Sequence, residues 1–446
     1  MRAALGLPGA PSPSGRAFSG VSTDTRALPA DTLFVALKGD RFDAHDFLPA
    51  ARAAGAAGAV VRRGTPPVEG LLVYEVDDTL HALGELARAR RRALPGPVVA
   101  ITGTNGKTST KEMIAAALRT RYRTHATRKN LNNLVGVPLT ILEAPEDAEA
   151  LVVEAGASVP GEMARHRAVI EPSITVITNV GAGHLEGFGS REAVLTEKLA
   201  LASGVVLAVV GPDPPALAEL ARKAARKVIT AGLADADRTP DRAELSDGGR
   251  PRVTVHGETF LLDALGMHQA GNAMLAWTVA EALGLDLAKV ARSLEALDLP
   301  GGRGELTEVG GLTVLNDAYN ANPISFRAAI ELARALRGDG RRLVFVAGTM
   351  RELGEAAPAL HAEIASLLVA LKPDLLAAVG DFVAALEPHR AGLGARLLTA
   401  PDAVSLGPLL AARLRGDELV VLKGSRGVAL ERLLPDLAAR TPSSTT

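Results

Sequence analysis

The chain has 446 residues, with 47% apolar and 22% charged side chains, a formal net charge of −1 and no cysteine. This length predicts two to four domains. The balanced charge excludes a broad attraction to nucleic acid or anionic membrane, and the lack of cysteine excludes disulfides, thiolate metal sites and thioester chemistry.

The first predicted unit, residues 1–93, is small and α/β. Pro and Gly interrupt its first residues before a signal-peptide core could form, and the whole chain has no run of roughly 18 apolar residues that could span a membrane, so we expect a cytoplasmic protein. Short apolar runs such as DTLFVAL and AGAVV precede the helical segment HALGELARARRRA. The sequence LPGP at residues 94–97 ends that helix and marks a domain boundary.

The second predicted unit, residues 94–302, alternates strands with helices. Buried-strand patterns occur at VVAIT, ALVVEAG, ITVITNV and VVLAVVG, and helical patterns at STKEMIAAALRTRY and HQAGNAMLAWTVAEALG. This alternation predicts a doubly wound, mainly parallel sheet. Residues 230–265 are richer in charge and turn residues, and we expect them to add antiparallel strands at an edge of that sheet.

The third predicted unit, residues 303–446, follows the linker LPGG and repeats the alternation. Strand patterns occur at LTVLND, RLVFVAG, LLAAVG and ELVVLKG, with helices near 324–337 and 357–371. We expect a second nucleotide-binding-like, Rossmann-like fold. The sequence therefore predicts three α/β domains.

The strongest chemical signal is TGTNGKTS at residues 102–109, directly between a predicted strand and a predicted helix. Glycines let the backbone approach phosphates, and N–H groups at the helix start supply positive potential. Lys107 would reach the β- and γ-phosphates, and the Thr108 hydroxyl would bind Mg²⁺. The longer form of this loop has glycine where Ile101 stands, so the match is to the shorter Gly-x-x-Gly-Lys-Thr form. A tight strand–helix turn with a chance Lys-Thr is the alternative.

Three further polar residues follow later strands. Glu154 ends the pattern ALVVE, where a carboxylate faces the ligand crevice of a parallel sheet and could hold Mg²⁺, or could lie on the surface. His184, in the glycine-rich loop TNVGAGHLEGF, could ligate a metal, orient a substrate or bond its own backbone. Lys198, in the helical run REAVLTEKLALA, would by default be solvated. No Asn-Lys-x-Asp signature is present, which disfavours a GTPase switch.

Taken together, these segments resemble the Mur ligase family. The matching set is GTNGKT at 103–108, NV and HLE within 179–186, Glu154 and Lys198. In that family the matching lysine is carbamylated by CO2. The resemblance implies that a carbamate on Lys198 and His184 hold a second Mg²⁺, while Thr108 and Glu154 serve the first, so that two cations neutralise charge on a transferring phosphoryl group. It implies catalytic roles for Lys107, Glu154, His184 and Lys198.

The resemblance also implies contacts with ATP. In HQAGN at 268–272, Asn272 would contact the adenine side, and the linker residue Arg303 would meet the phosphates. Asp317 would accept hydrogen bonds from the ribose, although its motif NDAYNANP could also be an ordinary Asx turn before a helix. The residues expected to bind ATP are Gly103, Thr104, Asn105, Gly106, Lys107, Thr108, Ser109, Asn272, Arg303 and Asp317.

Substrate-binding segments are implied in all three units. STDTR at 22–26 and KGDRFDAH at 38–45 resemble UDP-sugar-binding segments, and NLNN at 130–133 resembles a strip that faces the sugar and pyrophosphate, although amide-rich loops are common elsewhere. YNANP, GTMRELG and KGSRG resemble the family members that add D-alanyl-D-alanine. The residues expected to bind substrate are Thr25, Arg26, Asn130, Asn132, Asn133, Asn320, Arg351, Ser425 and Arg426.

The resemblance thus implies an ATP-dependent amide ligase, active as a monomer, that joins D-alanyl-D-alanine to a UDP-N-acetylmuramoyl-tripeptide through an acyl phosphate. A lysine- or diaminopimelate-adding relative is disfavoured because an Asp-Asn-Pro-Arg motif is missing. A folylpolyglutamate synthase is disfavoured by the UDP-type motifs of the first unit. A non-enzymatic P-loop switch would leave Glu154, His184 and Lys198 unexplained.

Overall fold

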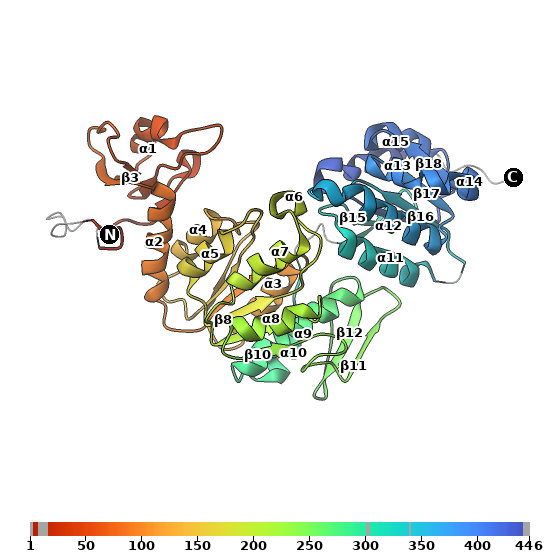
Figure 1. The fold of residues 1–446 in the computed structure, drawn as a ribbon, viewed down its shortest axis with the longest axis horizontal. Helices are drawn as coiled ribbons and strands as arrows, with labels where there is room; N and C mark the ends of the chain where they lie inside the picture. The colour runs from red at the N-terminus through yellow and green to blue at the C-terminus, as the bar shows by residue number, and fades with distance from the viewer. Residues whose placement is uncertain (1–2, 8–16, 300–303, 339, 440–446) are drawn as a thin grey trace.

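The computed structural model describes residues 3–7, 17–299, 304–338 and 340–439. Figure 1 shows three α/β units in a row, with the N-terminal unit at one end and the C-terminal unit at the other. The predicted fold class is confirmed, because each unit is built on a sheet whose strands are mostly parallel.

The first unit is a four-stranded parallel sheet in the order β1-β2-β3-β4. Alternate side chains of β2 face opposite cores, as the two-residue period of a strand requires. Phe34 packs with α1, whereas Leu33 and Val35 pack with α2. The elements are β1 (Val21–Ser22), β2 (Leu33–Val35), β3 (Gly58–Arg62), β4 (Leu72–Val76), α1 (Leu48–Ala53), α2 (Thr79–Arg92) and the 3-10 turns η1 (Thr25–Ala27) and η2 (Ala44–Phe47).

Helix α2 joins the first unit to the second. Its arginine run reaches the carboxyl-terminal ends of two helices of the second unit, where exposed carbonyls favour cations. Arg90 donates to the carbonyl of Ala144 (3.0 Å), and Arg88 and Arg92 pair with the carboxylate of Glu171 (2.8 and 2.6 Å). The basic run is therefore a contact between units rather than a solvated face.

The second unit is a six-stranded parallel sheet in the order β10-β9-β8-β5-β7-β6. Helices α3, α9 and α10 pack on one face, and α4, α5, α7 and α8 on the other. The strands are β5 (Val98–Thr102), β6 (Thr124–Ala126), β7 (Ala150–Glu154), β8 (Ile174–Ile177), β9 (Leu207–Val210) and β10 (Val228–Thr230). The helices are α3 (Lys107–Arg119), α4 (Gly136–Leu142), α5 (Glu162–Ile170), α6 (Leu185–Phe188), α7 (Arg191–Ala200), α8 (Ala216–Ala224), α9 (Met267–Ala282) and α10 (Leu287–Glu295).

The charge-rich segment after β10 does form antiparallel strands, but they do not extend the edge of the six-stranded sheet. Strands β11 (Arg242–Leu245), β12 (Pro251–Val255) and β13 (Glu258–Leu261) make a separate three-stranded sheet. Phe260 of β13 stacks on Trp277 of α9, with ring centroids 5.9 Å apart. The small sheet covers the outer face of the apolar helix α9, which explains why that helix is buried almost all round.

The third unit is a six-stranded sheet in the order β14-β15-β19-β16-β17-β18, parallel except for β14. Its strands are β14 (Glu305–Val309), β15 (Leu312–Asp317), β16 (Leu343–Ala347), β17 (Leu375–Val379), β18 (Leu397–Ala400) and β19 (Leu419–Lys423). Its helices are α11 (Pro323–Arg337), α12 (Ala357–Leu371), α13 (Asp381–Leu386), α14 (Arg390–Leu393), α15 (Ala403–Ala411) and α16 (Leu434–Ala439). The short 3-10 turns are η3 (Gly354–Ala356), η4 (Glu387–His389), η5 (Gly394–Arg396), η6 (Arg426–Val428) and η7 (Leu430–Leu433).

One helical stretch in the described part of the chain, Gly354–Leu371, is long and apolar enough by composition to cross a membrane, with a mean hydropathy of 1.2. It comprises η3 and α12. The inner face of α12 is buried through Leu360, Ile364 and Leu368, which join the same core as Phe345 of β16. The packing of the third unit accounts for its apolar composition.

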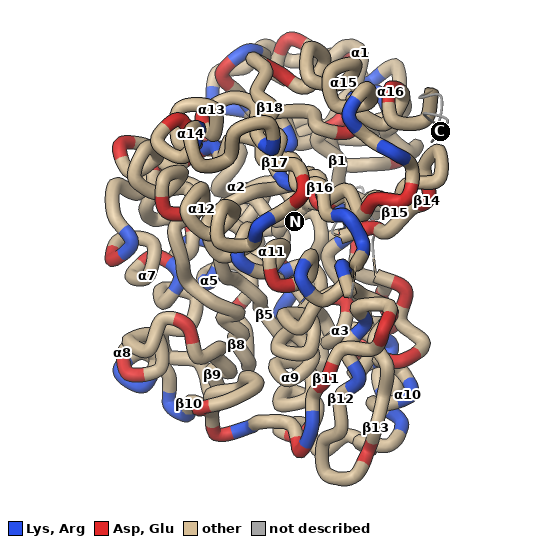
Figure 2. Tube along the Cα trace, turned by 90° about the vertical axis from the view of Figure 1, so that its right-hand side faces the viewer, with Lys and Arg blue, Asp and Glu red and all other residues tan. Residues whose placement is uncertain are grey.

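Charged residues of both signs are interspersed along the chain in Figure 2, and their formal sum is −1. A site for a polyanion must therefore be built locally.

Candidate active site

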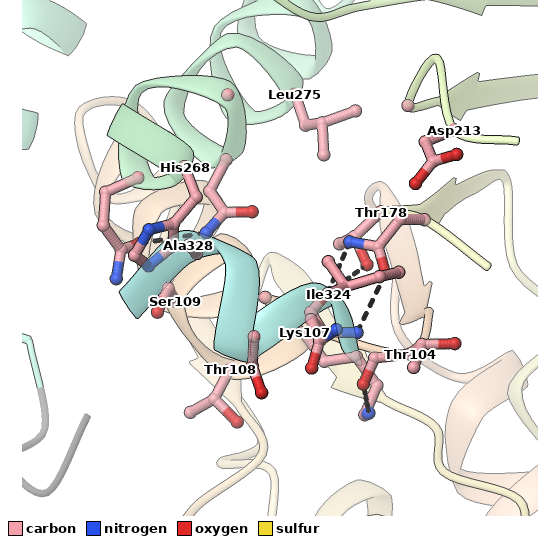
Figure 3. Close-up of a pocket in the computed structure, with 18 of the residues that line it drawn as sticks. Thr104, Lys107, Thr108, Ser109, Thr178, Asp213, His268, Leu275, Ile324 and Ala328 are labelled. Carbon is pink, nitrogen blue, oxygen red and sulfur yellow. Dashed lines mark hydrogen bonds between the residues drawn. The ribbon is translucent and has the colours of Figure 1, made fainter. Parts of the chain in front are cut away.

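A cavity of about 1050 Å³ lies where the carboxyl ends of the second unit's strands meet the third unit. In Figure 3 the start of α11, with Ile324 and Ala328, runs across the cavity above Lys107 and Thr108. Ligands of open parallel sheets bind at this edge, because strand-end loops and helix N-termini converge there. The cavity is therefore the candidate active site.

The loop at 102–109 has the backbone that a phosphate site needs. Gly103 and Gly106 have φ values of +150° and +78°, which residues other than glycine rarely adopt. A Cβ at Gly103 would collide with the Thr178 hydroxyl, and one at Gly106 would collide with the side chain of Asn272. Helix α3 starts at Lys107, so its free N–H groups face the cavity.

Thr108 and Glu154 meet at the floor of the site. The Thr108 hydroxyl donates to Glu154 Oε2 (2.8 Å), and the Asn132 amide donates to Glu154 Oε1 (2.8 Å). The backbone N–H of Glu154 donates to the Thr127 hydroxyl, which fixes the end of β7. Since Glu154 is buried, the alternative of a surface carboxylate is wrong.

Lys107, His184 and Lys198 gather on the other side of the loop. Lys107 Nζ donates to the carbonyls of Gly103 (2.9 Å) and Thr104 (3.1 Å). Lys198 is only 3% exposed, so the default of a solvated lysine is wrong. Burial lowers the pKa of Lys198 to about 7, and the charge of Lys107 adds to this.

His184 connects this group to the third unit. Its Nδ1 lies 2.6 Å from Glu352 Oε2, in the loop after β16. Burial lowers the pKa of His184. The carboxylate of Glu352 opposes this shift, and the charges of Lys107 and Lys198 add to it. His184 has a left-handed backbone (φ 56°), a conformation that is costly for a residue with a side chain and that clusters at functional sites.

The third unit adds a charge pair formed by a buried lysine and a partly exposed aspartate. Lys423, at the end of β19, is 1% exposed and lies 2.8 Å from Asp317 Oδ2. The same ammonium donates to the carbonyl of Asn320 (2.7 Å). Asp317, Asn320 and Lys423 all line the cavity.

Comparison with known proteins identifies the family. Residues 17–91, 101–280 and 302–426 match the family profiles described as "Mur ligase family, catalytic domain", "Mur ligase middle domain" and "Mur ligase, glutamate ligase domain". The UDP-N-acetylmuramoyl-tripeptide–D-alanyl-D-alanine ligase of Bacillus subtilis is 37% identical over 94% of this chain and 93% of its own length. The chain belongs to the Mur ligase family.

Solved structures agree with this assignment. The crystal structure I of MurF from Acinetobacter baumannii is 30% identical, covers 94% of this chain and 93% of its own, and has a TM-score of 0.84. MurF ligase from Thermotoga maritima in complex with ADP is 28% identical over 94% of this chain and 97% of its own, with a TM-score of 0.80. This Mur ligase is therefore an ATP-dependent ligase.

The remaining ATP-contact predictions of this Mur ligase concern Ser109, Asn272 and Arg303. Ser109 and Asn272 line the cavity, and Asn272 donates to Gln269 Oε1 (2.9 Å), so its amide is already oriented. Arg303 lies outside the described residues.

The residues predicted to bind substrate fall into three places. Asn130, Asn132 and Asn133 line the cavity, and Asn133 Oδ1 also accepts from the Gly136 N–H (2.8 Å) at the start of α4. Arg351 and Ser425 meet through a hydrogen bond from the Arg351 N–H to Ser425 Oγ (3.0 Å), on two adjacent strand-end loops of the third unit.

Thr25 and Arg26 lie in the first unit, where the largely exposed Arg26 pairs with Asp24 (2.6 Å). Arg426 lies over the ring of Tyr319, 5.5 Å from its centroid. These side chains do not line the cavity in the described part of the chain.

Sequence reasoning missed several cavity residues of this Mur ligase. The loops after β9 and β10 contribute Asp213 and residues 230–235. Asn179 after β8 was noted only as part of the family motif, and its Oδ1 accepts from the Asn105 N–H (3.0 Å). All follow strand ends, so the rule that ligands bind at carboxyl ends could have found them. Lys423 lies in a motif that was noted, but its pairing with Asp317 requires two strands 106 residues apart.

Proposed function

We propose that this Mur ligase joins D-alanyl-D-alanine to a UDP-N-acetylmuramoyl-tripeptide with hydrolysis of ATP to ADP and phosphate. ATP would transfer its γ-phosphoryl group to the terminal carboxylate of the tripeptide, giving an acyl phosphate and ADP. The amine of the dipeptide would then attack the acyl carbon, forming the amide and releasing phosphate. The relatives that cover nearly the whole chain carry this activity in their names, which supports the proposal.

The observation that carries the proposal is the phosphate loop beneath a cavity shared by two units. The loop residues and Lys107 line this cavity, and we propose that they stabilise the negative charge that spreads during phosphoryl transfer. Preorganised donors of this kind are usually the largest catalytic effect in such reactions. The start of α11 lies over the same loop. A covered site would keep water away from an acyl phosphate.

We further propose that two Mg²⁺ ions bind here. In the described residues no group of three or more His, Cys, Asp or Glu side chains is arranged around a point. Mg²⁺ nevertheless suits this site, because it is commonly held by one or two carboxylates together with phosphates and water. Thr108 and Glu154 offer hard oxygen ligands, and His184 with a carbamate on Lys198 would hold the second ion. When bound, the ions would neutralise charge on the transferring phosphoryl group.

The three units would divide the substrates among them. We propose that residues 1–93 hold the UDP part through Thr25 and Arg26, that residues 94–302 hold ATP, and that residues 303–446 bind the dipeptide through Asn320, Arg351, Ser425 and Arg426. Asn130, Asn132 and Asn133 would face the sugar and pyrophosphate, and Asn272, Arg303 and Asp317 would contact the nucleotide. Since one chain provides every residue of this scheme, we expect a monomer, acting in the cytoplasm where nucleotide-linked precursors and ATP are found together.

The test is phosphate release from ATP over a panel of UDP-muramoyl-peptides, with and without D-alanyl-D-alanine. We expect release with the tripeptide to rise strongly on addition of the dipeptide, since amine attack completes the cycle. Phosphate release could instead be faster with a UDP-muramoyl-dipeptide and free lysine or diaminopimelate. That result would reassign this enzyme to the lysine- or diaminopimelate-adding activity. Slow release that no amine stimulates would support the P-loop switch instead.

A further inference from the structure

Two asparagine side chains that are 217 residues apart in sequence form a reciprocal amide pair between the second and third units. Asn105 Nδ2 in the phosphate loop donates to Asn322 Oδ1 (3.0 Å), and Asn322 Nδ2 in the third unit donates to Asn105 Oδ1 (2.8 Å). Asn322 is 5% exposed. Asn105 is half-buried, and two hydrogen bonds in opposite directions set both the distance and the orientation of the two amide groups.

The hydrogen bonds of Asn105 are divided between two parts of the site. Its backbone N–H donates to Asn179 Oδ1 (3.0 Å), and its carbonyl accepts from the Thr178 hydroxyl (2.5 Å) and the Asn179 amide (3.1 Å). The side chain alone reaches the third unit. Asn105 therefore joins the phosphate loop, the end of β8 and the third unit at one residue.

Asn322 also begins the helix that covers the cavity. Its Oδ1 accepts from the Ser325 N–H (3.0 Å), and its own N–H donates to Ser325 Oγ (3.0 Å), which makes a capping box at the start of α11. Serine, threonine or aspartate would cap the helix as well. Only an amide side chain can cap the helix and at the same time donate and accept toward Asn105. Capping alone does not explain asparagine at this position.

Apolar contact supports the same docking. A Cβ placed at Gly181, in the loop after β8, would lie 3.2 Å from Ile324 Cγ1 on the first turn of α11. The absence of a side chain at Gly181 thus lets α11 approach the loop that leads to His184.

We propose that Asn322 is a positioning residue that docks the third unit on the phosphate loop through Asn105. The pair sets where α11 and the neighbouring strand ends, with Asp317, Asn320 and Lys423, stand above the transferred phosphoryl group. Asn105 is also expected to bind ATP, so any effect of docking on ATP affinity would be matched by an equal effect of ATP on docking. This role rests on the proposed function for its catalytic consequence, but the docking itself does not depend on which substrates are used.

The docking can be measured without turnover, because the chain contains no cysteine. The reporter is a double variant, Gly181→Cys/Ile324→Cys. The sulfur of the cysteine at position 324 would lie close to the present position of Ile324 Cγ1, which is near the Cβ of a side chain at position 181. A disulfide should therefore form when the third unit is docked on the phosphate loop. Asn322→Ser in this reporter keeps a capping oxygen and removes the reach to Asn105. We expect its rate of disulfide formation to fall on the order of tenfold, a typical coupling between sites.

Two further variants separate docking from capping. Asn322→Asp keeps the cap and one of the two hydrogen bonds, and we expect an intermediate rate. Asp402→Ala removes the cap of α15 elsewhere in the third unit, where Asp402 Oδ1 accepts from the Ser405 N–H (2.8 Å), and should leave the rate unchanged while lowering the melting temperature. Disulfide formation in Asn322→Ser at the rate of the parent reporter would overturn the proposal.

Kinetics provide the second test, in the cysteine-free chain. Asn322→Ser should lower kcat/KM for the dipeptide on the order of tenfold. When Asn105 is already replaced by alanine, adding Asn322→Ser should lower kcat/KM little further, because the partner of Asn322 has already been removed. Independent effects of the two substitutions would refute the pair. If no muramoyl peptide yields product but the reporter responds as expected, then the proposed function fails and the docking role stands.

Discussion

We predict that the buried amine of Lys198 reacts with CO2 to form a carbamate. CO2 reacts with the neutral amine and gives a carbamate and a proton, so the reaction depends on the fraction of amine that is neutral. Burial, with help from the charge of Lys107, lowers the pKa of Lys198 from 10.5 to about 7. At pH 8 about 90% of such a group is neutral, against about 0.3% of an ordinary lysine, which is a gain of about 300-fold.

The direction with pH follows from this lowered pKa. Below pH 7 the amine takes up a proton and cannot react, so at pH 6 the neutral fraction is only about 10%. We expect phosphate release by the wild type to fall from pH 8 to pH 6, to fall when CO2 is removed from the buffer, and to recover when bicarbonate is added.

Substitution provides the complementary measurement. Lys198→Ala should lose on the order of 10²–10³-fold in kcat, the usual cost of losing a charge-stabilising group, and should not respond to bicarbonate. A small carboxylate such as acetate should restore part of its activity by filling the vacated position. The control is Lys223→Ala, because Lys223 is a largely exposed lysine of the same unit that pairs with Glu219 on α8.

Two results would refute the reasoning. One is a wild type whose activity does not change on removal of CO2 at any pH between 6 and 9. The other is a crystal equilibrated with CO2 and Mg-ATP in which Lys198 has no added density.

Three further predictions concern the loop and the contact between units. Lys107→Ala should lower kcat on the order of 10²–10³-fold with an unchanged melting temperature, and turnover like that of the wild type would remove the phosphate-loop assignment. Gly106→Ala should weaken ADP binding by about tenfold or more, because a residue with a side chain is strained at φ +78° and its Cβ would collide with Asn272. Calorimetry measures the affinity, and an unchanged value would contradict the loop geometry. The hydrogen bond from Arg92 lowers the pKa of Glu171 to about 2, so its contribution to stability is present above its ordinary pKa of 4.5 and is lost as pH falls toward 2. Between about pH 4.5 and pH 2, the melting temperature of Glu171→Gln should fall less steeply than that of the wild type. If the two curves of melting temperature against pH run parallel, the ion pair contributes nothing to stability.

Much of the site could be predicted because its residues are contiguous. A phosphate loop of this form needs glycines at two positions and a lysine at the first position of the helix, and a backbone of four or five residues determines that geometry locally. Glu154 could be placed for a related reason, since the end of a parallel strand always faces the ligand edge of the sheet. The central strands of the three units could be predicted in the same way, as apolar runs bounded by turn residues.

Elements with weak patterns were missed. Strand β18 is four residues long and half-buried at the edge of its sheet, so its sequence LLTA carries little signal. Strands β11, β12 and β13 were expected, but their place was not, because a separate sheet forms only where the outer face of α9 needs cover. Such choices depend on surfaces that exist only after the helices have packed.

The sequence by itself therefore determined the α/β architecture and the glycine-rich turn at residues 102–109, since each depends on neighbours within one element. It also supplied the predicted ligands of phosphate and metal. The tertiary structure decided which of these groups act together. It buried Lys198 and so moved its pKa into the range where CO2 can react, and it brought Asn105 against Asn322 across 217 residues. Burial and contact between distant segments come from the packing of whole units, and a single sequence has no local signal for either.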